Sequence, residues 1–460
     1  MIRRALASAS TFALALLLTA PLGQHLQAQQ PVADQYRTVA NRIIDAALAD
    51  SSGAWTRLAA LVDYSGNRLS GSANLERGID WVLAEMRKDG LANVRGEPVM
   101  VPHWVRGEES LTLVEPRAAN IPMLGLGGSI GTPARGITAP VLVVGSYDEL
   151  TKRAAEAKGK IVLFDVPFTS YGETVQYRGG GASAAAKVGA VAALLRSVGP
   201  YGMRTPHTGS MRYDSTVARI PSAAIPMEDA MMFRRMQERG ERVVVTLRMQ
   251  AQTFPDALSR NVMGELVGRE KPSEIVVLGG HIDSWDVGLG AMDDAGGVVV
   301  AWEAVKLLKR LGLTPRRTIR VVGWTNEENG GRGGRAYLEA HKDEVHAVAM
   351  ESDGGVFSPT GFGFSGNDAA RALMTSAGSL LERIGAGRVG PYGGEADIDP
   401  LVRSGVPGLG LEVDGSKYFW YHHTPADTPD KLSPAEMQRC VAAFAVMAYI
   451  VAEMPELLPR

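Results

Sequence analysis

Five residues of the kinds that bind metal ions are spread over the last part of the chain, each within a short, unusual segment. They are His281, Asp293, Glu328, Asp353 and His423, and their segments read HIDSWDVGLGAMDDAGG, TNEENGG, MESDGG and YHHTPADT. Two imidazoles and three carboxylates suit a pair of divalent transition-metal ions that share one carboxylate. A further carboxylate, Glu327, stands beside a ligand where a general base would be needed. Together these residues predict metal-assisted hydrolysis.

The first segment indicates how neighbouring carboxylates could divide their roles. Asp283 lies two residues after His281 and, in an extended loop, can accept the free ring N–H of that histidine and fix its tautomer. Asp293 and Asp294 come just before the start of a predicted helix, where an aspartate is often only a cap. We expect Asp294 to be the cap and Asp293 to be the carboxylate that the two ions share.

The other segments supply a base and the second imidazole. Glu327 and Glu328 can point to different places, so Glu328 would bind metal while Glu327 moves a proton from a metal-bound water to the leaving amine. A solvated acidic loop is the ordinary alternative for such a pair. Only His281, His422 and His423 lie in loops rich in Asp, Gly and Thr, and we prefer His423 to His422 because it directly joins TPADT.

The elements around these segments predict an α/β fold. Strand-like runs such as EIVVLGG, RTIRVVGWT and HAVAME alternate with the helical stretches AGGVVVAWEAVKLLKRLG and GGRAYLEAHKDE, and a last helix begins near Pro434. This alternation favours a largely parallel sheet. Candidate ligands follow the strands, and the carboxyl ends of strands form the functional crevice of such sheets, so separate segments should meet at one edge.

The region from about residue 121 to 250 has a different pattern of predicted strands and helices. VLVVG and KIVLFDV read as buried strands, ASAAAKVGAVAALLRSV as a helix that ends near Gly199, and IPSAAIPMEDAMMFRRMQERGERVVVTLRM as strand, helix and strand. No cluster of candidate ligands falls there. Before it, residues 32–86 read as amphipathic helices with Gly90 as a stop.

Bulk properties exclude several classes of protein. The 460 residues are enough for two or more domains, and the net charge of −2 gives no sign of a nucleic-acid or anionic-membrane partner. Cys440 is the only cysteine, which excludes an intrachain disulfide and a cluster of thiolate ligands. Any metal must therefore be held mainly by nitrogen and oxygen atoms.

The N-terminus predicts a secretory signal peptide at residues 1–28. Arg3 and Arg4 precede an apolar core at Thr11 to Ala20, and Leu26-Gln27-Ala28 is a plausible cleavage site. The core is too short to span a bilayer, although an uncleaved anchor is the alternative. No later stretch is apolar enough to span one, so we expect a secreted or periplasmic protein without membrane contact after cleavage.

The order H-x-D, DD-A-G-G, N-E-E, E-S-D and H-T-P-A-D-T resembles the co-catalytic two-zinc exopeptidases, which include bacterial aminopeptidases and glutamate carboxypeptidases. The middle region is similar to a protease-associated domain, a smaller, mostly β module with helices. The resemblance implies a zinc-exopeptidase fold with a mixed, largely parallel central sheet flanked by helices. Its catalytic domain would comprise residues 29–118 and 253–460, and the inserted domain residues 119–252.

The resemblance also assigns roles to the candidate residues. His281 and Asp353 would hold one zinc ion, Glu328 and His423 a second, and Asp293 would bridge the two. Glu327 would be the general base, and Asp283 would support His281. The family further implies a cis peptide bond between Asp293 and Asp294.

Substrate features follow from the same resemblance. A metal-bridged hydroxide would attack small peptides, with dipeptides favoured. Lys417, Tyr418 and Tyr421 could bind a substrate carboxylate or the tetrahedral intermediate, and Glu395 and Asp397 could bind a free amino group. Ordinary loop packing is the equal alternative for these five residues. Relatives suggest a homodimer.

Other functions remain open from the sequence. They are an aminopeptidase for longer peptides, a non-catalytic binding ectodomain on the same fold, and a cyclising acyltransferase that uses one metal.

Overall fold

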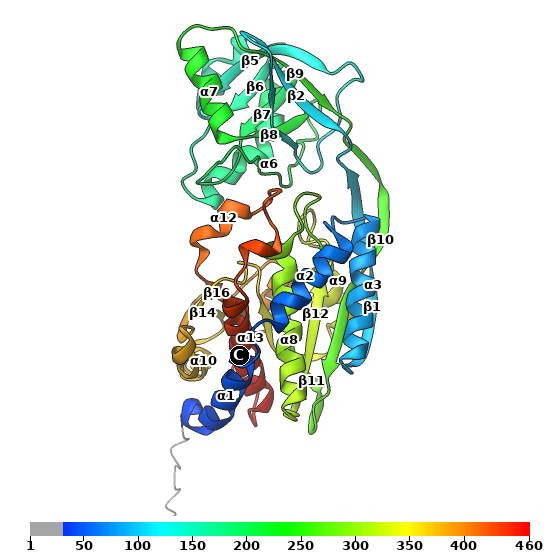
Figure 1. Cartoon of the computed structure of the whole chain (residues 1–460), viewed down its shortest axis with the longest axis vertical. Coiled ribbons are helices and arrows are strands. Elements are labelled where there is room, and N and C mark those ends of the chain that lie inside the picture. The colour runs from blue at the N-terminus through cyan, green and yellow to red at the C-terminus, as the bar shows by residue number, and fades with distance from the viewer. Residues whose placement is uncertain (1–30) are drawn as a thin grey trace, which may run out of the picture.

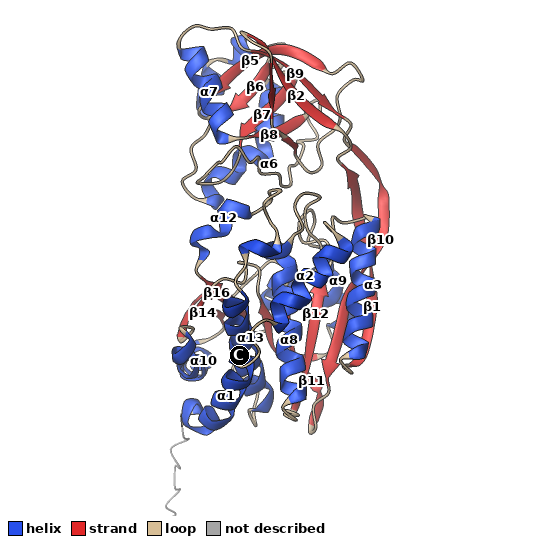
Figure 2. Ribbon diagram, in the orientation of Figure 1, coloured by secondary structure: helices blue, strands red, loops and turns tan. Residues whose placement is uncertain are grey.

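The computed structural model describes residues 31–460 and folds them around two sheets. The sheets lie one above the other along the long axis of the molecule, and the long strands β1 and β10 run between them (Figure 1). Most of the helices lie against the lower sheet (Figure 2). The predicted signal peptide, residues 1–28, falls outside the described residues.

The lower sheet has eight strands and carries the candidate ligands at its upper edge. In spatial order its strands are β1 (Ala92–Val105), β10 (Gln252–Leu266), β12 (Arg317–Trp324), β11 (Lys271–His281), β13 (Val345–Glu351), β16 (Gly408–Val413), β14 (Pro359–Ser365) and β15 (Arg388–Pro391). The central strands β12, β11, β13 and β16 are parallel, whereas β10 and β14 join this group antiparallel. The predicted mixed, largely parallel sheet is confirmed.

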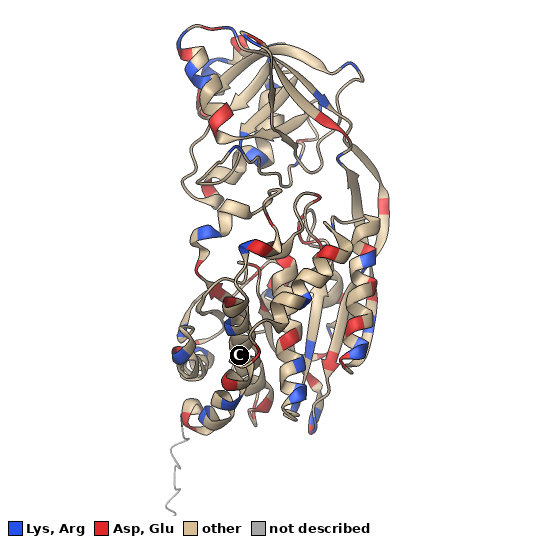
Figure 3. Cartoon of the chain, viewed as in Figure 1, with Lys and Arg blue, Asp and Glu red and all other residues tan. Residues whose placement is uncertain are grey.

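Helices cover both faces of the lower sheet because its buried strands are apolar on both sides. In β11, Val276 and Leu278 face one core while Ile275 and Val277 face the other. The first core contains α1 (Val32–Leu48), α2 (Gly53–Ser65), α3 (Ala73–Lys88), α8 (Gly296–Arg310), α10 (Asp368–Gly378) and α13 (Pro434–Glu453). The second contains α9 (Arg332–His341) and α11 (Asp399–Arg403). Along α3 and α8, acidic and basic residues are mixed on the outer surface (Figure 3).

Helix α13 corrects one expectation from the sequence. By length and composition alone it could cross a membrane, although no stretch after the N-terminus had been expected to qualify. In the structure 83% of its most apolar window is buried, and the helix packs against α1, α8 and α2. Its apolar character is therefore accounted for by its central position in the core.

The upper sheet is mixed and also has eight strands. Their spatial order is β3 (Ala119–Ile121), β2 (Glu109–Glu115), β9 (Val244–Met249), β5 (Ile137–Val144), β6 (Ile161–Phe164), β7 (Ala192–Arg196), β8 (Ser222–Ile225) and β4 (Leu124–Gly125). The helices of this unit are α4 (Tyr147–Lys152), α5 (Ala154–Ala157), α6 (Tyr171–Lys187) and α7 (Met227–Glu238). Strand β2 pairs with β9, so the predicted start of the insertion at residue 119 is about ten residues too late.

The prediction of a single alanine-rich helix that ends near Gly199 is also wrong. Helix α6 begins earlier, at Tyr171, and ends at Lys187, after which Gly189 adopts a positive φ of 81°. The following residues, Ala192–Arg196, form β7 between β6 and β8. Pairing on both sides within the sheet determines the conformation of this apolar run, which local sequence alone leaves ambiguous.

Candidate metal centre

All five predicted ligands meet above the carboxyl ends of the parallel strands. His281 ends β11, Asp353 follows β13 by two residues, and Glu328 lies in the turn after β12. Asp293 lies in the short turn Ala291–Ala295 before α8, and His423 follows the four-residue helix α12 (Tyr418–Tyr421). Neighbouring parallel strands bring their ends to one edge, which is why residues far apart in sequence gather here.

The ligands form two groups that share Asp293. Oδ1 of Asp293 lies 3.2 Å from Nε2 of His281, and that same nitrogen is 3.2 Å from Oδ1 of Asp353. On the other side, Oδ2 of Asp293 lies 3.3 Å from Nε2 of His423, which is 3.0 Å from Oε2 of Glu328. One carboxylate therefore faces two imidazole–carboxylate pairs, as a bridging ligand must.

These separations suit metal ions. Ligand atoms placed about 2.0–2.1 Å from a tetrahedral ion are about 3.3 Å apart. Oδ2 of Asp293 is buried and has no hydrogen-bond donor among the described residues. Burial alone would lower the pKa of His423, yet Glu328 and Asp293 raise it to about 9. Buried carboxylates thus favour positive charge at this place, which a divalent cation would supply.

Asp293, His422 and His423 together could hold a metal ion, and the distances favour His423 as the ligand. Nε2 of His422 is 3.7 Å from Asp293 Oδ2, farther than the 3.3 Å of His423, and no contact of His422 with Glu328 is present among the described residues. The two rings are stacked with centroids 3.5 Å apart. Nδ1 of His423 lies 3.4 Å from the carbonyl oxygen of Thr208 in the upper unit, which leaves Nε2 facing the carboxylates.

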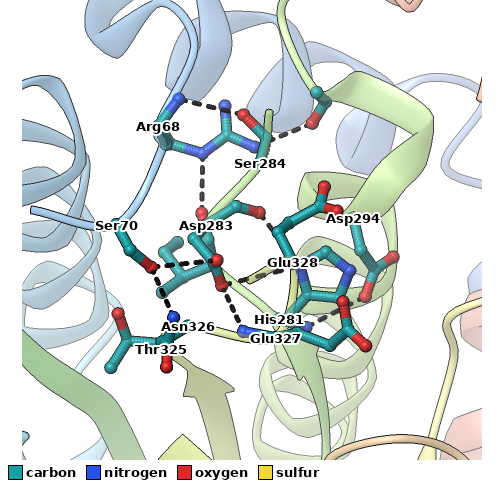
Figure 4. A network of polar contacts seen from close by, with 12 residues as sticks. Arg68, Ser70, His281, Asp283, Ser284, Asp294, Thr325, Asn326, Glu327 and Glu328 are labelled. Carbon is teal, nitrogen blue, oxygen red and sulfur yellow. Dashed lines mark hydrogen bonds and ion pairs between the residues drawn. The ribbon is translucent and has the colours of Figure 1, made fainter. Parts of the chain in front are cut away.

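Asp283 has a different role from the one predicted. Nδ1 of His281 lies 3.0 Å from the main-chain carbonyl oxygen of Asp283, whereas the Asp283 carboxylate is 3.7 Å away. Oδ1 of that carboxylate accepts the N–H of Glu327 at 3.0 Å, and Oδ2 accepts the hydroxyl of Ser70 at 3.3 Å. The loop bends so that the carbonyl, rather than the side chain, reaches the imidazole. Asp283 therefore positions the Glu327 turn (Figure 4).

Asp294 is a structural residue, as expected. Its Oδ1 accepts the N–H of Gly297 in the first turn of α8, and its Oδ2 accepts the N–H of His281. The peptide bond between Asp293 and Asp294 is cis, as the family resemblance implied. Asp427 of the TPADT segment accepts the N–H groups of Ala291, Met292 and Asp293, so it fixes the turn that carries the bridging carboxylate.

Glu327, the predicted general base, lies beside Glu328 in the turn after β12. It is half-buried and lines a cavity of about 460 Å³, while its main-chain N–H is held by Asp283. Burial, with added repulsion from Asp353 and Glu328, holds the pKa of Glu327 well above its usual range. No hydrogen bond of its carboxylate is present among residues 31–460, so the carboxylate is free to accept a proton.

Of the predicted substrate-binding residues Lys417, Tyr418 and Tyr421, only Tyr418 makes a side-chain polar contact with a predicted metal ligand within residues 31–460. The Tyr418 hydroxyl donates to the main-chain carbonyl of Asp353 at 3.3 Å, and its ring lies against His422. Lys417 is exposed, and Tyr421 packs against the lower core. Neither makes a side-chain polar contact with a ligand in the described chain.

The two acidic candidates differ from each other. Asp397 is buried with both carboxylate oxygens unpartnered, and burial raises its pKa to about 8. Glu395 is half-buried, and burial followed by Asp353 raises its pKa to about 8. Repulsion from Asp353 contributes to the raised pKa of both carboxyls.

Several supporting residues were missed by the sequence reasoning. Arg68 is fully buried and donates to the carbonyl oxygens of Ile282, Leu289 and Gly290 at 2.7–2.8 Å. Ser70 accepts a hydrogen bond from Asn326, the residue before Glu327. Ser70 and Arg68 lie more than two hundred positions before these partners, so no local motif could reveal them. Figure 4 shows these residues together with Asp283 and the Glu327 turn.

Arg68→Met is expected to lower the free energy of unfolding by about 3–5 kcal/mol, because it leaves buried carbonyls without donors. Burial lowers the pKa of Arg68 to about 10, which shows how far this cation is removed from water. Urea unfolding followed by circular dichroism measures the change. The matched variant Arg77→Met, on an exposed side chain of α3, should change stability by less than about 0.5 kcal/mol. Equal effects of the two changes would contradict this role.

Comparison with known proteins agrees with this site. The sequence profile of peptidase family M28 matches residues 261–448, which include all five ligands and Glu327. Carboxypeptidase Q of Xenopus laevis is 49% identical over 429 residues, covering 92% of this chain and 92% of that protein. This chain belongs to peptidase family M28. Carboxypeptidase Q of Mus musculus is 48% identical and covers 92% of this chain and 91% of its own. The M28 protein is a metallo-exopeptidase, a hydrolase.

Solved structures share the fold. A peptidase M28 precursor from Shewanella amazonensis has a TM-score of 0.89 at 35% identity, covering 93% of this chain and 99% of that one. A zinc aminopeptidase from Bacillus subtilis has a TM-score of 0.64 at 21% identity, with coverage of 88% and 98%. Both likenesses extend over most of the M28 chain, including the upper sheet and the lower one.

Proposed function

We propose that this chain is a two-zinc exopeptidase that acts outside the cytoplasm and hydrolyses small peptides, dipeptides above all. The observation that carries the proposal is the shared carboxylate: the two oxygens of Asp293 face two different imidazole–carboxylate pairs. Relatives named carboxypeptidase Q, at 48–49% identity over most of the chain, support an enzyme for the carboxyl ends of peptides.

The donor set favours zinc. The candidate ligand atoms are imidazole nitrogens and carboxylate oxygens. The one thiol, Cys440, is buried in α13 and donates a hydrogen bond to the carbonyl oxygen of Phe357, so it is not part of this site. His281 and Asp353 would hold one ion, Glu328 and His423 the other, and Asp293 both. When bound, the ions would polarise the scissile carbonyl and lower the pKa of the attacking water.

The protein's own residues would carry the proton and orient the substrate. Glu327 would accept a proton from the attacking water and deliver it to the leaving amine. Asp283 holds the Glu327 main chain in place. Tyr418, beside Asp353 and His422, would exchange its hydrogen bond to the Asp353 carbonyl for one to the developing oxyanion. The unpartnered carboxylate of Asp397, with Glu395, would favour a substrate ammonium group.

A peptide panel tests the proposed reaction. Hydrolysis is measured for dipeptides, for tripeptides to hexapeptides, and for the same peptides with acetylated N-termini. The proposal expects dipeptides to have the highest kcat/KM. Cleavage only of longer peptides with a free N-terminus would support the aminopeptidase alternative, and a protein that binds metal but cleaves none would be a binding module.

Export is tested by sequencing the mature N-terminus, which should begin after Ala28. The homodimer stays a prediction.

A further inference from the structure

A cavity of about 460 Å³ opens where the upper unit meets the Glu327 turn. Cavities of about 300–1,000 Å³ accommodate small-molecule ligands, so a dipeptide fits the available space. The lower unit contributes the base and the residues that follow it, and the upper unit contributes two loops. The lining residues are Pro102, Trp104, Gly127, Gly128, Ser210, Met211, Arg212, Thr253, Glu327, Glu328, Asn329, Gly330 and Gly331.

Arg212 is the only lysine or arginine among these lining residues. Its side chain is exposed, and within residues 31–460 its guanidinium makes no hydrogen bond or ion pair. The neighbouring arginine Arg178, in α6, is by contrast already engaged. Arg178 is buried and donates to the Tyr171 hydroxyl at 2.6 Å and to the Thr208 carbonyl at 3.3 Å.

The main chain around Arg212 is fixed to the catalytic turn. The Ser210 hydroxyl donates to the carbonyl oxygen of Glu328 at 2.7 Å. The N–H of Met211 donates to Gly127, and the N–H of Arg212 donates to Gly179, each at 3.0 Å. The main chain that carries this unpaired guanidinium is therefore held at a fixed position relative to the Glu327 turn.

We propose that Arg212 binds the free C-terminal carboxylate of the substrate. The residues that line the cavity include two acidic ones, Glu327 and Glu328, beside the reacting centre and one basic one, Arg212, from the upper unit. Opposite charges at different parts of one cavity complement a short peptide whose scissile bond lies near the base and whose carboxylate lies beyond it. Arginine suits this role because its planar fork can donate two hydrogen bonds to a carboxylate.

This inference rests on the proposed function and names the residue that would limit substrates to those with a nearby C-terminus. It also reassigns the carboxylate-binding role that the sequence gave to Lys417, Tyr418 and Tyr421. Lys417 is exposed in the turn Gly415–Lys417, and none of these three residues lines the cavity.

The test compares one dipeptide with its C-terminal carboxamide, using wild-type enzyme and Arg212→Ala. Wild type should prefer the free acid. The variant should lose about 10- to 100-fold in kcat/KM on the acid, chiefly through KM, and less than about 3-fold on the carboxamide. Arg212→Lys should recover part of the loss. Arg219→Ala removes another exposed arginine of the upper unit, which packs on Tyr213, and should leave both substrates unaffected.

Equal activity of wild type on the acid and the carboxamide would overturn the proposal, and so would equal losses on both substrates in Arg212→Ala. In each of these cases the peptidase assignment stands. Failure of wild type to cleave either substrate, in metal-loaded form, would overturn the proposed dipeptidase function together with this inference.

Discussion

Glu327→Gln is expected to reduce kcat for a small peptide by about 10²- to 10⁴-fold, the usual contribution of a general base. The amide keeps the size of the side chain but cannot accept the proton. Glu327 lines the cavity and is not among the groups that contact His281 or His423 in the metal centre. Metal content should therefore stay at the wild-type value, as measured by elemental analysis of the purified variant.

The matched variant for this experiment is Asn329→Ala, which changes another cavity-lining side chain in the same turn but removes no proton acceptor of suitable basicity. Its effect on kcat should be far smaller. Full activity of Glu327→Gln would show that another group moves the proton, and loss of metal from it would show that Glu327 is a ligand.

Asp293→Ala is expected to have an even broader effect, because each oxygen of this carboxylate serves a different half of the centre. Both ions should bind more weakly, and activity should fall by more than about 10³-fold at ordinary metal concentrations. Isothermal titration of the metal-free variant with zinc measures the affinity independently of turnover. His423→Ala and Asp353→Ala should each weaken mainly one of two binding steps.

His422→Phe is the control for Asp293→Ala. It keeps a ring stacked on His423 but removes the nitrogen that lies 3.7 Å from Asp293. Zinc binding in two steps should persist. If His422→Phe lost one step while His423→Ala kept both, the choice between the adjacent histidines would be reversed.

The ligands could be predicted from sequence because each lies in a short motif at a strand end. Alternating strand and helix patterns around His281, Glu328 and Asp353 were enough to place them at one sheet edge, which the structure confirms. The capping role of Asp294 likewise followed from its position before α8. These features depend on neighbouring residues and on the general geometry of parallel sheets.

The errors have non-local causes. The run Ala192–Arg196 became a strand because β6 and β8 lie on its two sides, and β2 belongs to the upper sheet because it pairs with β9 more than one hundred residues later. Asp283 was assigned to His281 by the H-x-D spacing and by the family resemblance, but the turn of the loop presents its main-chain carbonyl to the imidazole instead. Arg68 and Ser70 reach the site from an N-terminal segment that carries no recognisable motif.

The central claim is that this M28 chain is a hydrolase with two ions at a shared carboxylate, and one combined measurement tests it most directly. Bound metal per chain is determined together with dipeptide hydrolysis, before and after treatment with a chelator and after zinc is restored. We expect about two zinc ions per chain, loss of hydrolysis with the chelator, and recovery when zinc returns. Hydrolysis that persists in metal-free protein, or full activity with a single ion per chain, would contradict it.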